Sequence, residues 1–197
     1  MFPAVYSDRI LTFGRYTFPN PEADAKVPFR MKVGQLFVFG AQLGWLDVTL
    51  LDYPTEAAFQ KRLCELRQNA QDFLAYGEML RPLAPREKLP TVTGDWRNIW
   101  GGTSSVTLPA VVNGVWKAPD GRIAIFLVNV SLEDQRFAGR LTARDYGLEG
   151  RLALLLESLD GQERVEGQSN HRGGYDLDVA VPAGEAKAFV LKEMPLP

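Results

Sequence analysis

Histidine and cysteine are almost missing from this sequence, which has one of each, His171 and Cys64, among 197 residues. A single cysteine excludes a disulfide within the chain and a cysteine-rich zinc site. A catalytic triad or a histidine-based metal site needs more partners than one histidine provides. His171 lies in the polar stretch "QSNHRGGYD", so we interpret it as an exposed residue on a turn.

Long apolar runs and basic segments are also missing. The longest apolar runs, "IAIFLV" and "LALLL", are far shorter than the roughly 20 residues that span a bilayer. The N-terminal "MFPAVYSDRILTF" has no basic region followed by an apolar run, so we expect no signal peptide there. Because no segment concentrates Lys and Arg, we predict neither a nucleic-acid partner nor a membrane partner.

Nucleotide and hydrolase signatures are lacking as well. The sequence has no phosphate-binding Gly-Lys loop, no dinucleotide fingerprint and no G-x-S-x-G motif. We therefore predict no cofactor and no metal. Hydrophobic residues make up 46 % and charged residues 23 %, a balance typical of a folded protein with a sizeable core.

The first third of the chain predicts a strand and a long helix. Leu36–Phe39 is a continuous apolar run between glycines, which is typical of a strand buried on both faces. Farther along, apolar residues recur at steps of four and three and predict a helix over about 56–80, with Thr55 as its N-cap. These apolar residues are Phe59, Leu63, Leu66, Ala70 and Phe73. Much of the rest of the helix surface is occupied by Lys61, Arg62, Glu65, Arg67, Gln68 and Gln71.

From Arg86 onward the pattern is that of short strands. Asp120-Gly121 and Asp160-Gly161 separate strand-like runs, and Asp-Gly between such runs predicts a hairpin. Pro182–Gly184 is expected at the turn of a last hairpin. We predict an α+β protein that is mainly β: a short N-terminal β/α segment over 1–85 with one long helix, then an antiparallel β-sandwich over 86–197.

Carboxylates and tryptophans are the candidates for chemistry. Glycoside hydrolysis needs two carboxyl groups, and Asp8, Asp47, Asp52 and Glu78 are available in the N-terminal part. Asp47 is equally interpreted as a loop residue that caps a turn, and Glu78 as a helix surface residue.

Aromatic rings stack on sugar faces. We weigh that role for the tryptophans against a purely structural one, in which Trp96 and Trp100 fill the join between helix and sandwich. The four tryptophans are Trp45, Trp96, Trp100 and Trp116.

The order of these segments resembles the C-terminal part of (β/α)8-barrel glycoside hydrolases, in particular families related to α-galactosidases. The resemblance rests on "LFVFGAQLGWLDV", "FLAYGEMLRPL", "RIAIFLVNVSLEDQRFAGRLTARDYGL" and "VAVPAGEAKAFVLK". It implies that "FVFGAQLGW" is a last barrel strand and that the 56–80 helix is a last barrel helix. It implies substrate-contacting residues at the barrel rim, namely Tyr6, Asp8, Gln42, Trp45 and Asp47. In such enzymes the catalytic carboxylates lie on earlier strands.

Three functional interpretations follow. In the first, the chain is the C-terminal segment of a glycoside hydrolase-like protein and is inactive when isolated from an upstream catalytic region. In the second, it is a free-standing carbohydrate-binding or protein-interaction sandwich with exposed tryptophans. In the third, an unpaired strand edge around Leu36–Phe39 leads to a homo-oligomer.

Overall fold

The mainly β, α+β class predicted from the sequence is confirmed. The computed structural model describes residues 12, 26–44, 46, 48–97, 102–148, 154–159, 161–162, 164–170 and 174–193. Its helical elements are α2 (Lys26–Val38), η1 (Val48–Asp52), α3 (Pro54–Asn69), α4 (Gln71–Leu74) and η2 (Ala143–Tyr146). Among the helices it describes, none combines the length and the apolar character that crossing a membrane requires.

The strands begin after the last long helix. They are β1 (Glu78–Leu80), β2 (Ala84–Pro85), β3 (Thr91–Arg97), β4 (Thr103–Pro109), β5 (Val111–Lys117), β6 (Ile123–Asn129), β7 (Gln135–Thr142), β8 (Leu154–Ser158), β9 (Arg164–Asn170), β10 (Gly174–Val181) and β11 (Ala186–Glu193).

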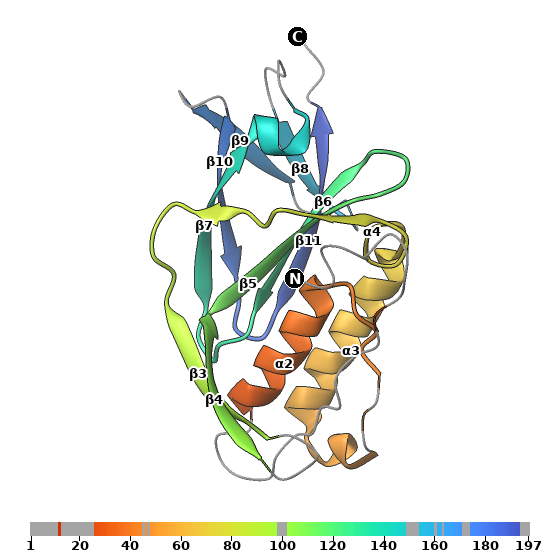
Figure 1. Cartoon of the computed structure of the whole chain (residues 1–197), viewed down its shortest axis with the longest axis vertical. Coiled ribbons are helices and arrows are strands. Elements are labelled where there is room, and N and C mark those ends of the chain that lie inside the picture. The colour runs from red at the N-terminus through yellow and green to blue at the C-terminus, as the bar shows by residue number, and fades with distance from the viewer. Residues whose placement is uncertain are drawn as a thin grey trace.

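The strands other than β3 and β4 form an antiparallel sandwich. Their order is β1-β5-β6-β11-β8-β9-β10-β7-β2. Strand β9 joins the two layers, because Arg164–Gly167 pairs with β8 whereas Gln168–Asn170 pairs with β10. The first layer is therefore β1-β5-β6-β11-β8, and the second is β10-β7-β2 (Figure 1).

Strand β6 separates two apolar cores. Ile123, Ile125 and Leu127 face the sandwich interior, where they meet residues such as Phe137 of the second layer. The alternate residues Ala124, Phe126 and Val128 belong to a core shared with the helices. Because every residue of β6 is buried, this strand lies at the centre of a three-layer arrangement of helices, first sheet and second sheet.

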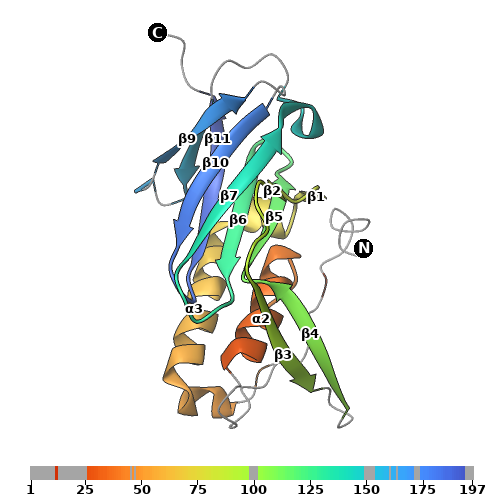
Figure 2. The same ribbon diagram turned by 90° about the vertical axis from the view of Figure 1, so that its left-hand side faces the viewer.

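The helical layer covers the outer face of the first sheet. Helices α2 and α3 pack side by side, and α2 also contacts β3, β5 and β6 (Figures 1 and 2). Trp116 of β5 is 1 % exposed, and its indole Nε1 donates a hydrogen bond to the carbonyl oxygen of Val38 at 2.9 Å. The sandwich thus supplies a partner for a carbonyl in the last turn of α2, where such groups have no partner within the helix.

The strand predicted over Leu36–Phe39 is wrong, because these residues form the last turn of α2 and the turn after it. A helix packed on several sides is apolar around its circumference and loses the period of an amphipathic helix. Gly34, read as a strand boundary, lies inside α2, where a Cβ atom would be 2.6 Å from Cγ1 of Val130. The last barrel strand that the resemblance implied over these residues, and the unpaired strand edge predicted there, are therefore wrong as well.

The single helix predicted over about 56–80 is shorter and interrupted. Helix α3 ends at Asn69, α4 covers Gln71–Leu74, and Glu78–Leu80 is strand β1, which pairs with β5. Gly77 lies at this change of structure. A Cβ atom at Gly77 would be 2.4 Å from the carbonyl oxygen of Phe73 and 2.6 Å from that of Lys117. The close approach of helix and strand therefore requires glycine.

Two of the three predicted turns behave as expected. The Asp120-Gly121 turn joins the paired strands β5 and β6, and Gly161 lies between the paired strands β8 and β9; Asp160 is outside the described residues. The hairpin predicted at Pro182–Gly184 is wrong. Strand β10 pairs with β7 and β9, whereas β11 pairs with β6 and β8, so this turn crosses from one layer to the other.

One side of the sandwich is closed by residues 78–85. Strand β1 extends the first layer and β2 extends the second, with Leu83 buried between them. Asn113 accepts a hydrogen bond from the Leu83 amide at 2.8 Å. Tyr146 is 8 % exposed and its hydroxyl donates to the carbonyl oxygen of Arg81 at 2.7 Å. Side chains therefore satisfy the backbone of this connecting segment.

Burial raises the pKa of Tyr146 to about 12, above the ordinary value of about 10 for tyrosine. The folded pKa lies above the unfolded one, so the stabilisation is complete below pH 10 and is lost as the pH rises towards 12. We expect a loss of roughly 2–3 kcal/mol across that window. In an absorbance titration of tyrosinate, Tyr146→Phe should lack the component that ionises last. An unchanged titration curve would contradict this assignment.

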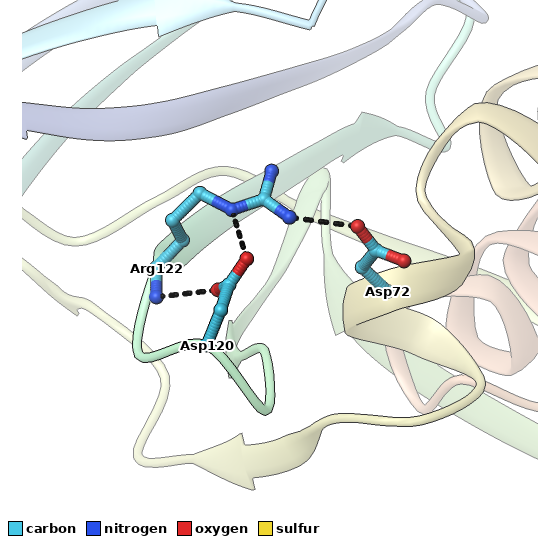
Figure 3. Close-up of polar contacts among 3 residues, drawn as sticks. All are labelled: Asp72, Asp120 and Arg122. Atoms are coloured by element: carbon cyan, nitrogen blue, oxygen red, sulfur yellow. Dashed lines mark hydrogen bonds and ion pairs between the residues drawn. The ribbon is translucent and has the colours of Figure 1, made fainter.

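An exposed ion-pair network ties α4 to the β5–β6 turn (Figure 3). Arg122 Nη2 is 2.7 Å from Asp72 Oδ2, and Arg122 Nε is 2.6 Å from Asp120 Oδ2. The guanidinium also lies 5.3 Å from the centroid of the Phe73 ring. Hydrogen bonds from Arg122 lower the pKa of Asp120, and the two carboxylates raise the pKa of Arg122.

Candidate functional site

Among the five residues expected at a barrel rim, Gln42, in the segment after α2, is the one that the structure describes. Helix α2 ends in a Schellman motif, in which Gly40 N–H donates to Phe37 O and Ala41 N–H donates to Leu36 O. Gly40 has φ +70°, and a Cβ atom there would be 2.6 Å from the Trp116 ring. The packing of the end of α2 on Trp116 therefore fixes the position from which the segment of residues 40–44 leaves the helix.

Two side chains of α3 hold this segment. Arg67 donates from Nε to the carbonyl oxygen of Ala41 and from Nη2 to that of Gly40, each at 3.0 Å. Gln60 donates from Nε2 to the carbonyl oxygen of Leu43 at 2.7 Å. Burial lowers the pKa of Arg67. Residues 40–43 are therefore fixed through their backbone, and the half-buried side chain of Gln42 is not used in these bonds.

Replacing Arg67 by alanine is expected to destabilise the fold by about 1–3 kcal/mol, because two carbonyl oxygens lose a charged donor. Urea unfolding measures the loss. Amide hydrogen exchange should accelerate around residues 40–44. Gln68→Ala is the matched control, because Gln68 is the exposed neighbour on α3. Equal behaviour of the two variants would show that the backbone contacts of Arg67 contribute nothing.

A buried charged cluster lies between the helices and the sandwich. Arg30 of α2 and Glu56 of α3 are 7 % and 3 % exposed. Arg30 Nη1 donates to the carbonyl oxygen of Ser131 at 2.8 Å, and its guanidinium lies 5.8 Å from the Phe59 ring centroid. Burial lowers the pKa of Arg30, and the charge of Glu56 partly opposes that shift.

Two sandwich turns surround this arginine. Asn129, fully buried, accepts from the backbone N–H and hydroxyl of Ser131, and donates to the carbonyl oxygens of Glu133 and Val181. Gly184, with φ +66°, lies so close that a Cβ atom would be 2.8 Å from Arg30 Cζ. The cluster therefore joins α2 to the turns between β6 and β7 and between β10 and β11.

The predicted site residues are only partly placed. Tyr6, Asp8, Trp45 and Asp47, like Trp100 and His171, lie outside the described residues. Asp52 ends η1 and Glu78 begins β1, and both are exposed. The sixteen residues of α3 lie between them and span about 24 Å. Paired glycosidase carboxyl groups lie within about 10 Å. Figure 1 shows α4, which precedes β1, at the end of α3 opposite to η1, so the fold does not bring Asp52 and Glu78 together as such a pair.

The two described tryptophans are structural. Trp96 is 8 % exposed and Trp116 is 1 % exposed, and both belong to the core shared with the helices. Neither ring is available to stack on a sugar. For Trp96 this agrees with the structural role weighed above and disagrees with the exposure that a binding module needs.

Arg67 is a site residue that the sequence reasoning missed. The sequence placed it off the apolar face of the helix without giving it a role, and the structure shows it half-buried and bonded to residues 40–41. Glu56, Gln60 and Arg67 follow at steps of four and seven, the spacing of one helix face. That spacing was the available signal. Across the part of the chain described here, no group of three or more His, Cys, Asp or Glu side chains gathers as a metal site would require.

No protein-family model matches this sequence, and no curated protein matches it. Glycoside hydrolases are among the solved structures that resemble it. An α-amylase from Geobacillus thermoleovorans is 15 % identical with a TM-score of 0.41, over 71 % of this chain and 23 % of the amylase. A GH27 β-L-arabinopyranosidase from Geobacillus stearothermophilus is 12 % identical with a TM-score of 0.37, over 85 % of this chain and 30 % of the arabinopyranosidase.

A third structure, a putative α-N-acetylgalactosaminidase from Bacillus halodurans, is 9 % identical with a TM-score of 0.41, over 86 % of this chain and 31 % of that protein. The chain therefore spans between 23 % and 31 % of the length of these three proteins.

Proposed function

We propose that this chain is the C-terminal segment of a glycoside hydrolase-like protein and that it does not hydrolyse glycosides by itself. Its sandwich supports the end of an upstream catalytic region, and the helical layer connects the two. Residues Tyr6, Asp8, Gln42, Trp45 and Asp47 are proposed to lie at the rim of that region's substrate site. The sandwich segments of the resemblance to glycoside hydrolases, which form β6, β7, β10 and β11, support this proposal, whereas the segment read as a last barrel strand is helical and does not.

The observation that carries the proposal is the way the sandwich holds the segment of Gln42. The first sheet fixes the end of α2 through Trp116, and α3 fixes residues 40–43 through Gln60 and Arg67. These contacts position a loop without assembling a carboxylate pair from Asp52 and Glu78. Such an arrangement suits a supporting module whose loop contributes to a site completed elsewhere.

The experiment has two parts. The DNA upstream of the Met1 codon is sequenced, and both this chain and the product of any continuous longer frame are assayed against a panel of nitrophenyl glycosides. We expect activity in the longer product alone, abolished by amide substitutions of its own upstream carboxylates. Hydrolysis by the purified short chain would overturn the proposal, as would a longer product that encodes no barrel-like repeats.

A further inference from the structure

The hairpin of β3 and β4 presents an unusual strand edge. Seven residue pairs join β3 to β4, and among the described residues neither strand pairs with any other. The hairpin packs on α2 through β3 and projects beside that helix, away from the sandwich (Figure 2). The outer edge of β4, Thr103–Pro109, is thus a seven-residue row of backbone groups that no other described strand pairs with.

The edges of the sandwich are protected in a way that β4 is not. Its edge strands β1 and β2 have three and two residues, and β2 contains Pro85. Short edge strands, proline and charged side chains all discourage pairing between molecules. Strand β4, "TSSVTLP", is longer, has no charged residue, and has proline only at its last position. Before Pro109, the strand therefore has neither a proline nor a charged side chain to discourage pairing, and it is not short.

The side chains of β4 are suited to pairing with an identical strand. Thr103, Ser105 and Thr107 are exposed and alternate with Val106 and Leu108, which pack partly against the core shared with the helices. An antiparallel pair of β4 strands places hydroxyl residues opposite hydroxyl residues and apolar residues on one face. The hydroxyls of Thr93 and Thr107 already lie 2.8 Å apart across the β3–β4 pair, which is the contact that such a ladder repeats.

Charge does not oppose pairing with a second copy, because β4 has no charged side chain. An antiparallel β4 pair brings no like charges together, whereas β3 carries Asp95 and Arg97. Specific binding of a strand from a different protein requires pockets or charges beside the edge that contact every second side chain of that strand. Strand β4 has no charged side chain that could make such a contact. A two-fold axis between the two β4 strands lets the backbone groups of both edges form hydrogen bonds with each other.

We propose that β4 is a self-association edge, which pairs antiparallel with β4 of a second copy of this chain to form a four-stranded sheet. The two α2 helices then lie on the same face of that sheet. This inference rests on the hairpin geometry and is independent of the proposed function. It moves the predicted oligomer contact from Leu36–Phe39, which is helical, to Thr103–Pro109.

Sedimentation velocity of the full chain over a range of concentrations tests the proposal. We expect a monomer–dimer equilibrium. Ser105→Lys places a charge at the edge and should weaken the dimer at least about tenfold, since lysine at an edge opposes pairing. Thr91→Lys is the matched control, because Thr91 is equally exposed on β3 and should leave the equilibrium unchanged. Circular dichroism of each variant checks folding.

Opposite charges provide the decisive second measurement. Ser105→Asp alone should also weaken association, whereas an equimolar mixture of the Ser105→Lys and Ser105→Asp chains should recover the dimer as a heterodimer. Cross-strand neighbours lie within about 5–8 Å, so the two side chains reach each other. A wild-type chain that stays monomeric at its solubility limit overturns the proposal, and so does a dimer that Ser105→Lys and Thr91→Lys weaken equally.

Discussion

Replacing Phe126 by alanine is expected to lower the free energy of unfolding by about 3–5 kcal/mol, the cost typical of removing a fully buried aromatic ring. Phe126 is 0 % exposed and lies on β6, facing the helices. Its ring centroid is 5.6 Å from that of Phe37 on α2 and 6.3 Å from that of Phe73 on α4, both in edge-to-face geometry. One substitution therefore removes contacts to two helices.

The opposite face of the same strand offers a matched control. Leu127 is 1 % exposed and points into the sandwich interior, so Leu127→Ala should also destabilise the fold, by about 2–5 kcal/mol. The two variants should differ in where protection is lost. Amide hydrogen exchange should accelerate mainly in α2 and α4 for Phe126→Ala, and mainly in β7 and β10 for Leu127→Ala. Chemical denaturation gives the total loss for each.

Two results would contradict this description of β6. A Phe126→Ala variant that loses less than about 1 kcal/mol would show that the helical layer does not depend on this ring. An identical exchange pattern in both variants would show that the two cores do not open separately. Either result would remove the physical basis for treating the helices as a layer held by the first sheet.

The sandwich could be predicted because its signals are local. The β5–β6 hairpin is encoded by Asp120-Gly121, where Asp120 accepts hydrogen bonds from Arg122 and Gly121 takes φ +89°. Strand β6 is continuously apolar because it is buried between two cores. The turn has its cause within its own residues, and the apolar run of β6 lies between turn signals at a length typical of a strand, so a single sequence reveals both.

The errors arise where distant packing decides the structure. Helix α2 is enclosed by α3, β3, β5 and β6, so it has no polar stripe and its apolar run resembles a buried strand. The Pro182–Gly184 turn carries ordinary hairpin residues, but the partners of β10 and β11 lie in different layers. The sequence patterns named "YDLDVAVP" as the strand after the Asp160-Gly161 turn, but the strand that follows it is β9, "RVEGQSN". The polar sequence of β9 has no alternation, and its pairing comes from β8 and β10.

The same reasoning explains the candidate site. Gln42 was predicted in a loop that follows an apolar run. It does follow such a run, but the run is the end of helix α2 and not a strand. The residues that hold the segment, Gln60 and Arg67, lie on α3 and reach it only in the folded chain. A helical wheel indicates which face they share, but it does not reveal that carbonyl oxygens of residues 40–43 lie opposite.

Removing the buried carboxylate of Glu56 should have an effect as large as that of Phe126. Arg30 Nε and Glu56 Oε1 are buried without a hydrogen-bond partner among the described atoms, so the two opposite charges compensate each other with few additional bonds. Glu56→Leu leaves the guanidinium buried beside Phe59 and Ser131 with no carboxylate to balance it. Glu56 acts on Arg30 through its charge rather than through a hydrogen bond, and leaving a buried charge uncompensated typically costs about 3–5 kcal/mol.

A double variant tests whether the two buried charges interact. Replacing both groups, as Arg30→Met with Glu56→Leu, removes the desolvation penalty together with the charges, so it should be more stable than Glu56→Leu alone. Asp72→Ala is the control for removing a carboxylate from an exposed arginine, and it should cost much less, because the Asp72 side chain is 62 % exposed. Urea unfolding of the four chains and the wild type measures the differences. Additive losses in Arg30→Met and Glu56→Leu would mean that the two charges do not interact, and α2 would then be held to the sandwich turns by the Arg30–Ser131 bond and apolar packing alone.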